Sequence, residues 1–441
     1  MQTSFDLPQP SSPPRRSAAA DSGTLPCTPE SLLATINAFD HWLVSNGESS
    51  FDPYDIWGTR YGRKARRLYY DKHPLGLPMV APLLFLEIVF PRWRKAVVTP
   101  ERFATADAQL LLAYLNLFRS SANRRHLFKA RRLGKELLGY SVLGYSGLCW
   151  GYPFDWENQR GMWGRNTPFI TCTPYCYEAY CALAEGTGDR EALNSAASIA
   201  SFVFHDLHDS PAGPGAAAAS YSPHDDSHVV NASAYRAWVL YDSAQRFGRP
   251  DYLEKAEANL KFILQSQQPD GSWFYAVDSA GSFIDHFHTC FVLKNLLKIA
   301  SLEKRPDLEA AVRRGYNFYR DQLFDADGLP KSFAIRPRLG IVRFEMYDFA
   351  EAITLGTLLQ KQIPEAYQHA QQLAEVVRRD YQLPDGHFVT RVYIGGVRHT
   401  LPFLRWPQSQ LFLALTNLYA SMTSARQPKP SIPVSKVPTT K

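Results

Sequence analysis

Two kinds of predicted helix alternate along the chain. In 254–267, 307–324 and 365–381, apolar residues recur on one side of a helix and charged residues occupy the other. Between such segments lie helices that are apolar nearly all round, at 108–118, 175–184, 231–244, 287–300, 346–359 and 407–420. The first kind is typical of an outer layer and the second of helices buried on all sides. The pattern therefore predicts an all-α protein with inner and outer helices.

The apolar segments begin at nearly regular intervals. Their approximate starts are residues 103, 173, 229, 285, 343 and 406, which are 70, 56, 56, 58 and 63 residues apart. Self-similarity of this length is a repeat signature. Six inner helices that alternate with outer ones predict an (α/α)6 toroid, with a helix near 28–46 closing the ring. An open α-solenoid is the alternative.

The connections from outer to inner helices carry a second repeat. Asp-Gly followed by extended, aromatic-containing sequence occurs in 268–277, 324–335 and 383–396. Because Gly readily adopts the positive φ of a tight turn, these segments predict short β-hairpins gathered on one face of the toroid. Long connections on one face of a regular scaffold are a common place for a binding site.

Aromatic residues are concentrated in these connections. They are Trp150, Tyr152, Trp156, Trp163, Trp273, Tyr275 and Trp406. Flat rings beside carboxylates and arginines suit a sugar, whose C–H faces stack on the rings while its hydroxyls need polar partners. Trp156, Trp273 and Trp406 are thus candidate substrate-binding residues. The alternative is that single tryptophans pack the hairpins onto the helices.

Acidic, histidine and tyrosine side chains of the same connections could transfer protons. Asp226 and Asp285 are candidate acids or bases, although Asp285 also stands at an N-cap position. His286 and His288 are two residues apart and point in different directions on a helix, and His288 is expected to face the lumen. With Tyr347 it could act in an epimerase or lyase. Arg343 and Arg405 could then hold a uronate carboxylate.

The six cysteines raise the question of a zinc site. Cys149, Cys172, Cys176 and Cys290, with His288, are soft ligands of the kind that zinc prefers. The sequence contains no Cys-x-x-Cys, and free cysteines in apolar helices are usually small core residues. We therefore predict no metal and no cofactor. Six cysteines in a long chain without a secretory signal indicate reduced thiols in the cytoplasm.

The composition indicates which classes of binding partner are not expected. The 441 residues include 48 basic and 42 acidic side chains, and the basic clusters 60–67 and 124–132 are interpreted as solvated helix faces. No nucleic-acid-binding motif and no apolar run of about 18 residues is present, so neither nucleic acid nor an integral membrane segment is expected. Residues 1–27 and 425–441 are predicted to be disordered tails of a toroid domain at 28–424.

Five stretches support a family resemblance: "FDPYDIWGTR" (51–60), "GLCWGYPFDW" (147–156), "HVVNASAYRAWVL" (228–240), "QQPDGSWFYA…SFIDHFHTCFVLKNLL" (267–297) and "LRWPQSQLFLALTNL" (404–418). They resemble (α/α)6-toroid proteins encoded with bacterial exopolysaccharide and capsule genes, which are related to six-hairpin glycosidases. The resemblance implies a role in polysaccharide biosynthesis or modification. It implies site residues Asp52, Asp55, Asp285 with His288, and Arg405 with Trp406. This chain departs from the pattern at His286 and Cys290, where Asn and Gly are common, and in 343–352.

Three functions follow as hypotheses. The first is acid/base modification of a glycan, by a hydrolase, lyase or uronyl epimerase. The second is a non-catalytic glycan-binding or scaffold protein with partners in a polysaccharide assembly. The third is a terpene cyclase or prenyltransferase-like toroid, suggested by the "DGSW" turn and by "PHDDSH" at 223–228.

Overall fold

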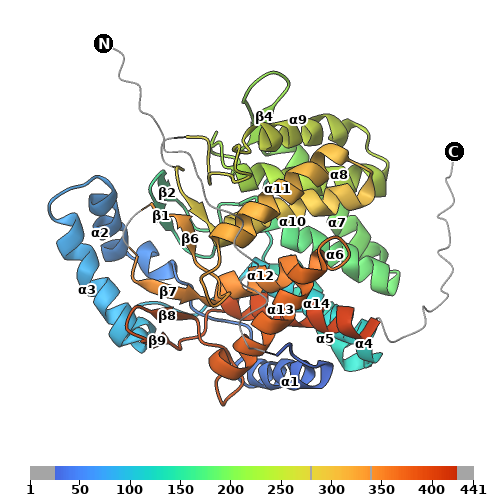
Figure 1. The fold of residues 1–441 in the computed structure, drawn as a ribbon. Coiled ribbons are helices and arrows are strands. Elements are labelled where there is room, and N and C mark those ends of the chain that lie inside the picture. Colours follow the sequence, from blue (N-terminus) through green and yellow to red (C-terminus); the bar gives the residue numbers. More distant parts are fainter. Residues whose placement is uncertain (1–24, 279–280, 338–339, 425–441) are drawn as a thin grey trace, which may run out of the picture.

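The computed structural model describes residues 25–278, 281–337 and 340–424 (Figure 1). Residues 1–24 and 425–441, which make up nearly all of the two predicted tails, lie outside the described residues. Cys27, at the end of the predicted N-terminal tail, is buried and donates its backbone N–H to the carbonyl of Gln371 at 3.3 Å. The ordered packing therefore includes this residue.

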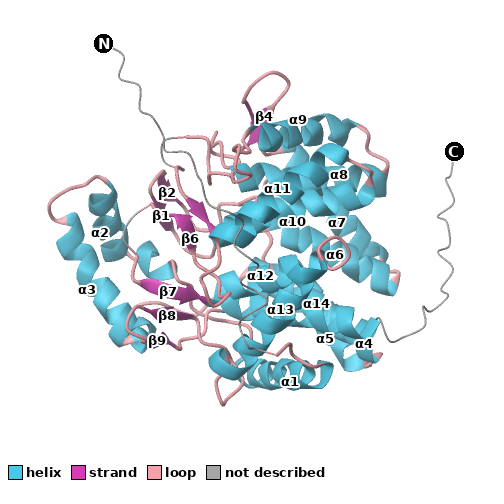
Figure 2. Cartoon of the chain, viewed as in Figure 1, coloured by secondary structure: helices cyan, strands magenta, loops and turns pink. Residues whose placement is uncertain are grey.

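Six inner helices form a closed ring (Figures 1 and 2). They are α4 (Ala104–Ser121), α6 (Thr173–Thr187), α8 (Val230–Phe247), α10 (His286–Leu302), α12 (Met346–Leu358) and α14 (Ser409–Ser424). Each packs against the next, and α14 packs against α4. The outer helices are α5 (Arg124–Gly139), α7 (Arg190–His205), α9 (Asp251–Gln265), α11 (Pro306–Gln322), α13 (Pro364–Val376) and α1 (Pro29–Asn46). The predicted all-α (α/α)6 toroid is confirmed, and the open solenoid is not adopted.

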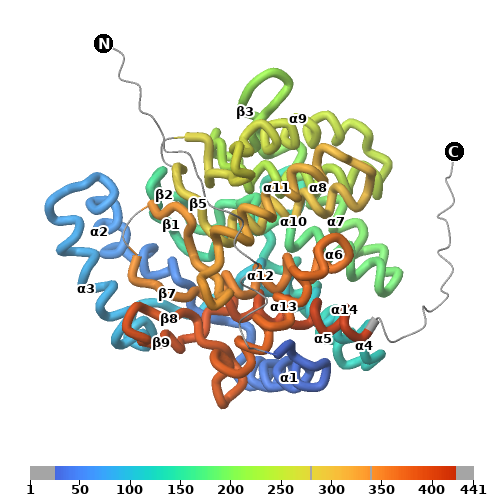
Figure 3. The backbone as a smooth tube through the Cα atoms, in the orientation of Figure 1, coloured from blue at the N-terminus to red at the C-terminus, as the bar shows by residue number. Residues whose placement is uncertain are grey.

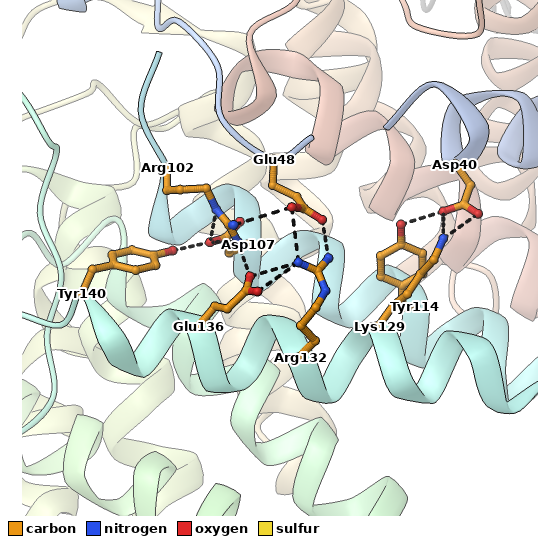
Figure 4. A network of polar contacts seen from close by, with 9 residues as sticks. All are labelled: Asp40, Glu48, Arg102, Asp107, Tyr114, Lys129, Arg132, Glu136 and Tyr140. Carbon is orange, nitrogen blue, oxygen red and sulfur yellow. Dashed lines mark hydrogen bonds and ion pairs between the residues drawn. The ribbon is translucent and has the colours of Figure 1, made fainter. Parts of the chain in front are cut away.

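A polar network ties α1 to the first hairpin of the ring (Figure 4). Asp40 of α1 accepts hydrogen bonds from the Tyr114 hydroxyl and from Lys129 Nζ, each at 2.6 Å. The other members of the network are Glu48, Arg102, Asp107, Arg132, Glu136 and Tyr140. Since α1 packs on α14 while Tyr114 belongs to α4, these contacts join the last repeat to the first.

Local capping sets many of the helix boundaries. Thr28, Asp189 and Asp285 accept backbone N–H groups in the first turns of α1, α7 and α10. Gly188 and Gly248 end α6 and α8 in the left-handed conformation that glycine adopts without steric cost. The boundaries of the inner helices thus follow from neighbouring residues as well as from apolar periodicity.

The strands are short, antiparallel and confined to the connections. The two-stranded pairs are β1 (Trp156–Asn158) with β2 (Gly161–Trp163), β3 (Asp209–Pro211) with β4 (Ala217–Ala219), and β5 (Ile284–Asp285) with β6 (Phe333–Ile335). A three-stranded sheet comprises β7 (Val342–Glu345), β8 (Arg391–Tyr393) and β9 (Arg398–His399). The β5–β6 and β7–β8 pairs join successive repeats, so pairing between connections stiffens one face of the toroid.

The Asp-Gly turns form as predicted, with shorter pairing than expected. Gly271, Gly328 and Gly386 have φ values of 93°, 74° and 106°. The turns at Gly328 and Gly386 are each closed by an isolated bridge, Phe324 with Pro330 and Gln382 with Phe388, rather than by a regular hairpin. The extended segments beyond these turns instead pair with their neighbours around the ring.

A helical hairpin departs from the repeat. It consists of α2 (Arg60–Tyr70) and α3 (Gly76–Val89), inserted between α1 and α4 and flanked by the short helices η2 (Asp55–Gly58) and η3 (Pro91–Ala96). The tube in Figure 3 shows both helices standing outside the ring, on the left of the view. Of two further short helices, η4 (Val377–Tyr381) follows α13 and η5 (Leu404–Gln408) precedes α14. Within the described chain, no helix has the length and hydropathy that crossing a bilayer requires.

Candidate functional site

A cavity of about 240 Å³ opens where the connections meet the N-terminal ends of the inner helices. Most of its wall is aromatic: Tyr54, Tyr70, Tyr152, Trp156, Trp163, Tyr175, Tyr221, Tyr235, Tyr275, Phe283, Phe287, Phe291, Tyr347 and Trp406. Its polar wall includes Arg66, Asn158, Gln159, Arg160, Ser227, His288 and Arg405. No Asp or Glu of the described ranges lines it, so positive charge and ring faces dominate the interior.

His288 is oriented by Asp285 at the start of α10. Asp285 is 3% exposed, and its Oδ1 accepts the backbone N–H of His288 at 3.0 Å. Its Oδ2 lies 2.7 Å from Nδ1 of the same histidine, which assigns the Nδ1–H to this contact. Nε2 of a neutral His288 then carries the free lone pair. The imidazole lies between the rings of Tyr275 and Phe287, whose centroids are 4.5 and 4.2 Å away.

His286 faces away from the cavity. Its Nε2 contacts the Tyr319 hydroxyl at 2.8 Å, and its Nδ1 lies 3.2 Å from the carbonyls of Leu323 and Lys331. Burial lowers the pKa of His286 to about 3, because the charged imidazolium would lose its hydration. The structure thus places the two histidines on different sides of α10, with His288 at the cavity.

Arg405 is held by Asp52 at the wall of the cavity. Nε and Nη2 of Arg405 donate to the two carboxylate oxygens of Asp52 at 2.5 and 2.8 Å. The guanidinium also lies 4.6 Å from the centroid of the Tyr152 ring. Because both Asp52 oxygens are engaged by Arg405 and the pair is buried, Asp52 orients the arginine rather than reaching into the cavity.

Asp55 belongs to a neighbouring ion pair outside this cavity. It pairs with Arg94, which also lies 2.6 Å from Glu87. Burial raises the pKa of Asp55 to about 6, against the opposing effect of Arg94. Its Oδ2 accepts the backbone N–H of Asp52 at 2.7 Å, so Asp55 supports the segment that carries Asp52.

Tyr347 and Trp406 form a stacked pair in the wall. Their ring centroids are 3.8 Å apart with an interplanar angle of 7°, and Phe287 meets both rings edge-on at 5.5 and 5.0 Å. Burial raises the pKa of Tyr347 well above its ordinary value. Its hydroxyl therefore keeps its proton and can donate a hydrogen bond, and it can release the proton only to a strongly basic oxygen such as a departing alkoxide.

Arg66 of α2 is a cavity residue that the sequence analysis missed. Its guanidinium lies over the rings of Tyr54, Trp57 and Tyr70 at 5.2–5.6 Å, and its Nε donates to the Tyr70 hydroxyl at 2.9 Å. Its buried Nη1 has no hydrogen-bond partner among the described residues. The sequence predicts a solvated face for the basic cluster at 60–67, and the one signal against this interpretation is the presence of Tyr61 within the cluster and of Tyr69 and Tyr70 just after it.

Three predicted site residues lie away from the cavity. Asp226 is exposed on the connection before α8, and Arg343 is exposed on β7 beside the Phe344 ring. Trp273 is 3% exposed, and its Nε1 donates to the carbonyl of Ile263 at 2.9 Å, which makes it a packing residue between the outer helices. Predicted residues that the structure does gather at the cavity are Trp156, His288, Tyr347, Arg405 and Trp406, with Asp52 and Asp285 behind them.

Two other carboxylates near α12 are withdrawn from solvent. Burial raises the pKa of Asp348 well above its ordinary value, because the charged carboxylate would lose its hydration. Burial also raises the pKa of Glu345, although Arg391 lies 3.1 Å from it. Neither side chain lines the cavity, and both sit in the packing beneath the rim.

The cysteines are buried in the packing, and Asp225 of the "PHDDSH" segment stabilises its own loop. Cys27, Cys149, Cys172, Cys176, Cys181 and Cys290 are all buried and free, and burial raises the pKa of Cys149 to about 12. Across the described ranges, no group of three or more His, Cys, Asp or Glu residues is placed to hold a metal ion. Asp225 accepts hydrogen bonds from the backbone and hydroxyls of Ser222 and Ser227, so it shapes its own loop.

Comparison with solved structures finds the same toroid fold in other proteins. A sugar epimerase from a ruminal bacterium superposes with a TM-score of 0.55 at 13% identity, covering 76% of this chain and 98% of the other. An unsaturated glucuronyl hydrolase from Streptococcus agalactiae gives a TM-score of 0.57 at 10% identity, covering 95% and 98%. Cellobiose 2-epimerase from Bacillus thermoamylovorans gives 0.56 at 11%, covering 72% and 87%. The chain shares their toroid fold.

Sequence comparison adds no family assignment. No protein-family model matches the chain, and no curated protein matches it. At 10–13% identity the likeness to the solved structures concerns the fold.

Proposed function

We propose that the protein modifies a uronate-containing glycan by transferring a proton at the sugar carbon next to the carboxylate, as an epimerase or a lyase. The observation that carries this proposal is the Asp285–His288 pair beside a cavity that no described carboxylate lines. Histidine is the side chain best suited to proton transfer near neutral pH.

The arginines of the cavity support an acidic sugar as substrate. Arg66 offers a buried Nη1 without a partner, and Arg405 is fixed by Asp52 in a defined orientation. Arginine binds carboxylates through strong, directional hydrogen bonds. The aromatic wall suits the C–H faces of sugar rings. A neutral glycan would give the Arg66 guanidinium, whose buried Nη1 has no partner among the described residues, no anionic group to bind.

The proposed chemistry uses Nε2 of His288 as the base. Nε2 removes the proton from the carbon next to the carboxylate, and the electron pair passes into the carboxylate as an enolate that an arginine stabilises. Return of a proton to the opposite face gives the epimer. Expulsion of the neighbouring glycosidic oxygen, protonated by a tyrosine such as Tyr347, gives an unsaturated uronate instead.

Hydrolysis by two carboxylates fits the cavity less well. Such enzymes place an acid and a second carboxylate about 5–9.5 Å apart across the scissile bond. Asp285 is engaged by His288, while Asp348 and Glu345 are buried outside the cavity. The arrangement therefore favours proton transfer at carbon over direct glycoside hydrolysis.

Two observations support a proposed role in polysaccharide biosynthesis. Solved structures with this fold include proteins described as sugar epimerases and as unsaturated glucuronyl hydrolases. The five sequence segments resemble proteins encoded with exopolysaccharide genes. We therefore place the reaction in polysaccharide biosynthesis, in the cytoplasm and with partners of that assembly.

The test is a turnover assay with matched acidic and neutral oligosaccharides. Uronate-containing substrates are followed by ultraviolet absorbance for unsaturated products and by NMR for epimers, and the corresponding neutral sugars serve as controls. Product from the acidic series alone supports the proposal. Binding of oligosaccharides without any product would favour the glycan-binding alternative, and hydrolysis of a neutral glycan would overturn the proposed chemistry.

A further inference from the structure

The α2–α3 hairpin exposes an apolar face. On α3, Leu77, Leu84, Phe85 and Val89 are 63%, 38%, 57% and 47% exposed. Their spacing puts them on one side of the helix, which is therefore not covered by any part of the chain that the structure describes. Phe90 continues this face beyond the helix and is 58% exposed.

The position of the hairpin presents this face outward. Figure 1 shows α2 and α3 outside the ring of inner and outer helices, with α3 at the edge of the molecule. Tyr61 of α2 donates its hydroxyl to the carbonyl of Met79 at 3.1 Å, which binds the two helices together. Contiguous apolar surface of this kind marks a site of protein or membrane association.

Most of the exposed charged side chains that flank this face along the chain are positive, and Asp71 is the acidic exception. Glu87, the one acidic residue of α3, faces the protein interior, where it lies 2.6 Å from Arg94 and 3.0 Å from His399. Exposed cations precede and follow the apolar positions along the chain: Arg60, Lys64, Lys72, Arg92 and Lys95. Apolar side chains flanked by basic ones are typical of helices that lie in the interface of an anionic membrane.

We propose that the α2–α3 hairpin docks the protein on an anionic membrane surface. The apolar side chains of α3 enter the boundary between headgroups and acyl chains, and the cations bind the lipid phosphates. α3 has 14 residues, too few to span a bilayer, so it lies in the interface. A two-fold contact with a second copy would instead bring these cations close to their own copies, which favours the lipid surface.

Docking through this hairpin also involves the cavity. Arg66 and Tyr70 belong to α2 and line the cavity from the side of the hairpin. A membrane-bound hairpin would thus keep one wall of the cavity close to the lipid surface. The docking proposal does not depend on which reaction the cavity performs.

The test is co-sedimentation of the full chain with phosphatidylcholine vesicles, with and without phosphatidylglycerol. We expect binding to the anionic vesicles alone, weakened by salt. The double substitution Leu84→Ser with Phe85→Ser should weaken binding by about tenfold or more, since two apolar side chains no longer enter the lipid. Phe128→Ser on α5, where Phe128 is 70% exposed, is the matched control and should bind as the parent does.

A second pair of substitutions tests the charge without touching the apolar face. Lys72→Glu with Lys95→Glu should reduce binding to anionic vesicles and leave the protein folded, because both side chains are exposed. Absence of vesicle binding by the parent chain would overturn the proposal. So would a dimer, measured by light scattering, that the Leu84 and Phe85 substitutions dissociate, because it would assign the face to a second copy.

Discussion

Asp285 makes two contacts with His288: Oδ1 accepts its backbone N–H at 3.0 Å, and Oδ2 lies 2.7 Å from its Nδ1. One carboxylate therefore caps α10 and fixes the tautomer and direction of the imidazole. The same carboxylate thus accounts both for the N-cap role expected of Asp285 and for the chemical role proposed for it. The two roles can be separated by substitution.

Asp285→Asn should reduce kcat by about 100-fold or more while changing the free energy of unfolding little, because Asn keeps the N-cap acceptor but loses the charge that orients His288. Asp285→Ala removes the cap as well and should cost about 1 kcal/mol more in stability. Steady-state kinetics and urea denaturation measure the two effects. A normal kcat for the Asn variant would contradict the role given to the carboxylate.

Tyr347→Phe should lower kcat by about 100-fold and leave KM nearly unchanged, because the ring that stacks on Trp406 remains while the hydroxyl is lost. Tyr367→Phe is the control, since the Tyr367 hydroxyl of α13 contacts Ser421 of α14 at 2.9 Å and does not line the cavity. If both variants turn over substrate at the parental rate, Tyr347 does not deliver the proton.

Arg66→Gln should raise KM for an acidic oligosaccharide by about tenfold or more and leave KM for a neutral one unchanged, because a charged hydrogen bond to the substrate is lost. Arg405→Gln should behave differently. It leaves Asp52 buried without its cation and should destabilise the protein by about 3–5 kcal/mol. Equal KM values for acidic substrate in the parent and the Arg66 variant would remove this arginine from the site.

His286 should make stability fall in acid. Its folded-state pKa of about 3 lies below the ordinary 6.5, so the unfolded chain binds more protons between these values. The free energy of unfolding that neutral His286 contributes is fully present above pH 6.5. It declines by about 1.4 kcal/mol per pH unit as the pH falls toward 3. His286→Asn should flatten this part of the curve, measured by urea denaturation from pH 7 to 4. An unchanged slope would contradict the buried neutral state.

The repeat could be predicted from sequence because its causes are local. Apolar periodicity distinguishes inner from outer helices, and caps such as Asp285 mark their ends. The direction of His288 followed from the same helical geometry, since residues two apart on a helix diverge. The closure of the ring could be predicted because six repeats follow one another at nearly regular spacing along the sequence.

Contacts between distant segments could not be predicted in this way. Trp273 resembled a rim residue beside its Asp-Gly turn, yet it packs against Gly315, where a Cβ would lie 2.4 Å from the Trp273 ring. The α2–α3 hairpin interrupts the repeat, and its apolar second helix has the composition of a core helix although one side is exposed. Arg66 lines the cavity because of where α2 lies in the fold, which local periodicity does not indicate.

In the proposed reaction, His288 exchanges a proton with the carbon next to a sugar carboxylate. Incubation of a uronate oligosaccharide with the protein in deuterated water, followed by NMR, measures deuterium incorporation at that carbon. We predict incorporation by the parent and by His224→Gln, whose histidine is exposed beside Tyr145, and a loss of about 100-fold or more in His288→Gln. Undiminished incorporation by His288→Gln would show that His288 does not transfer this proton.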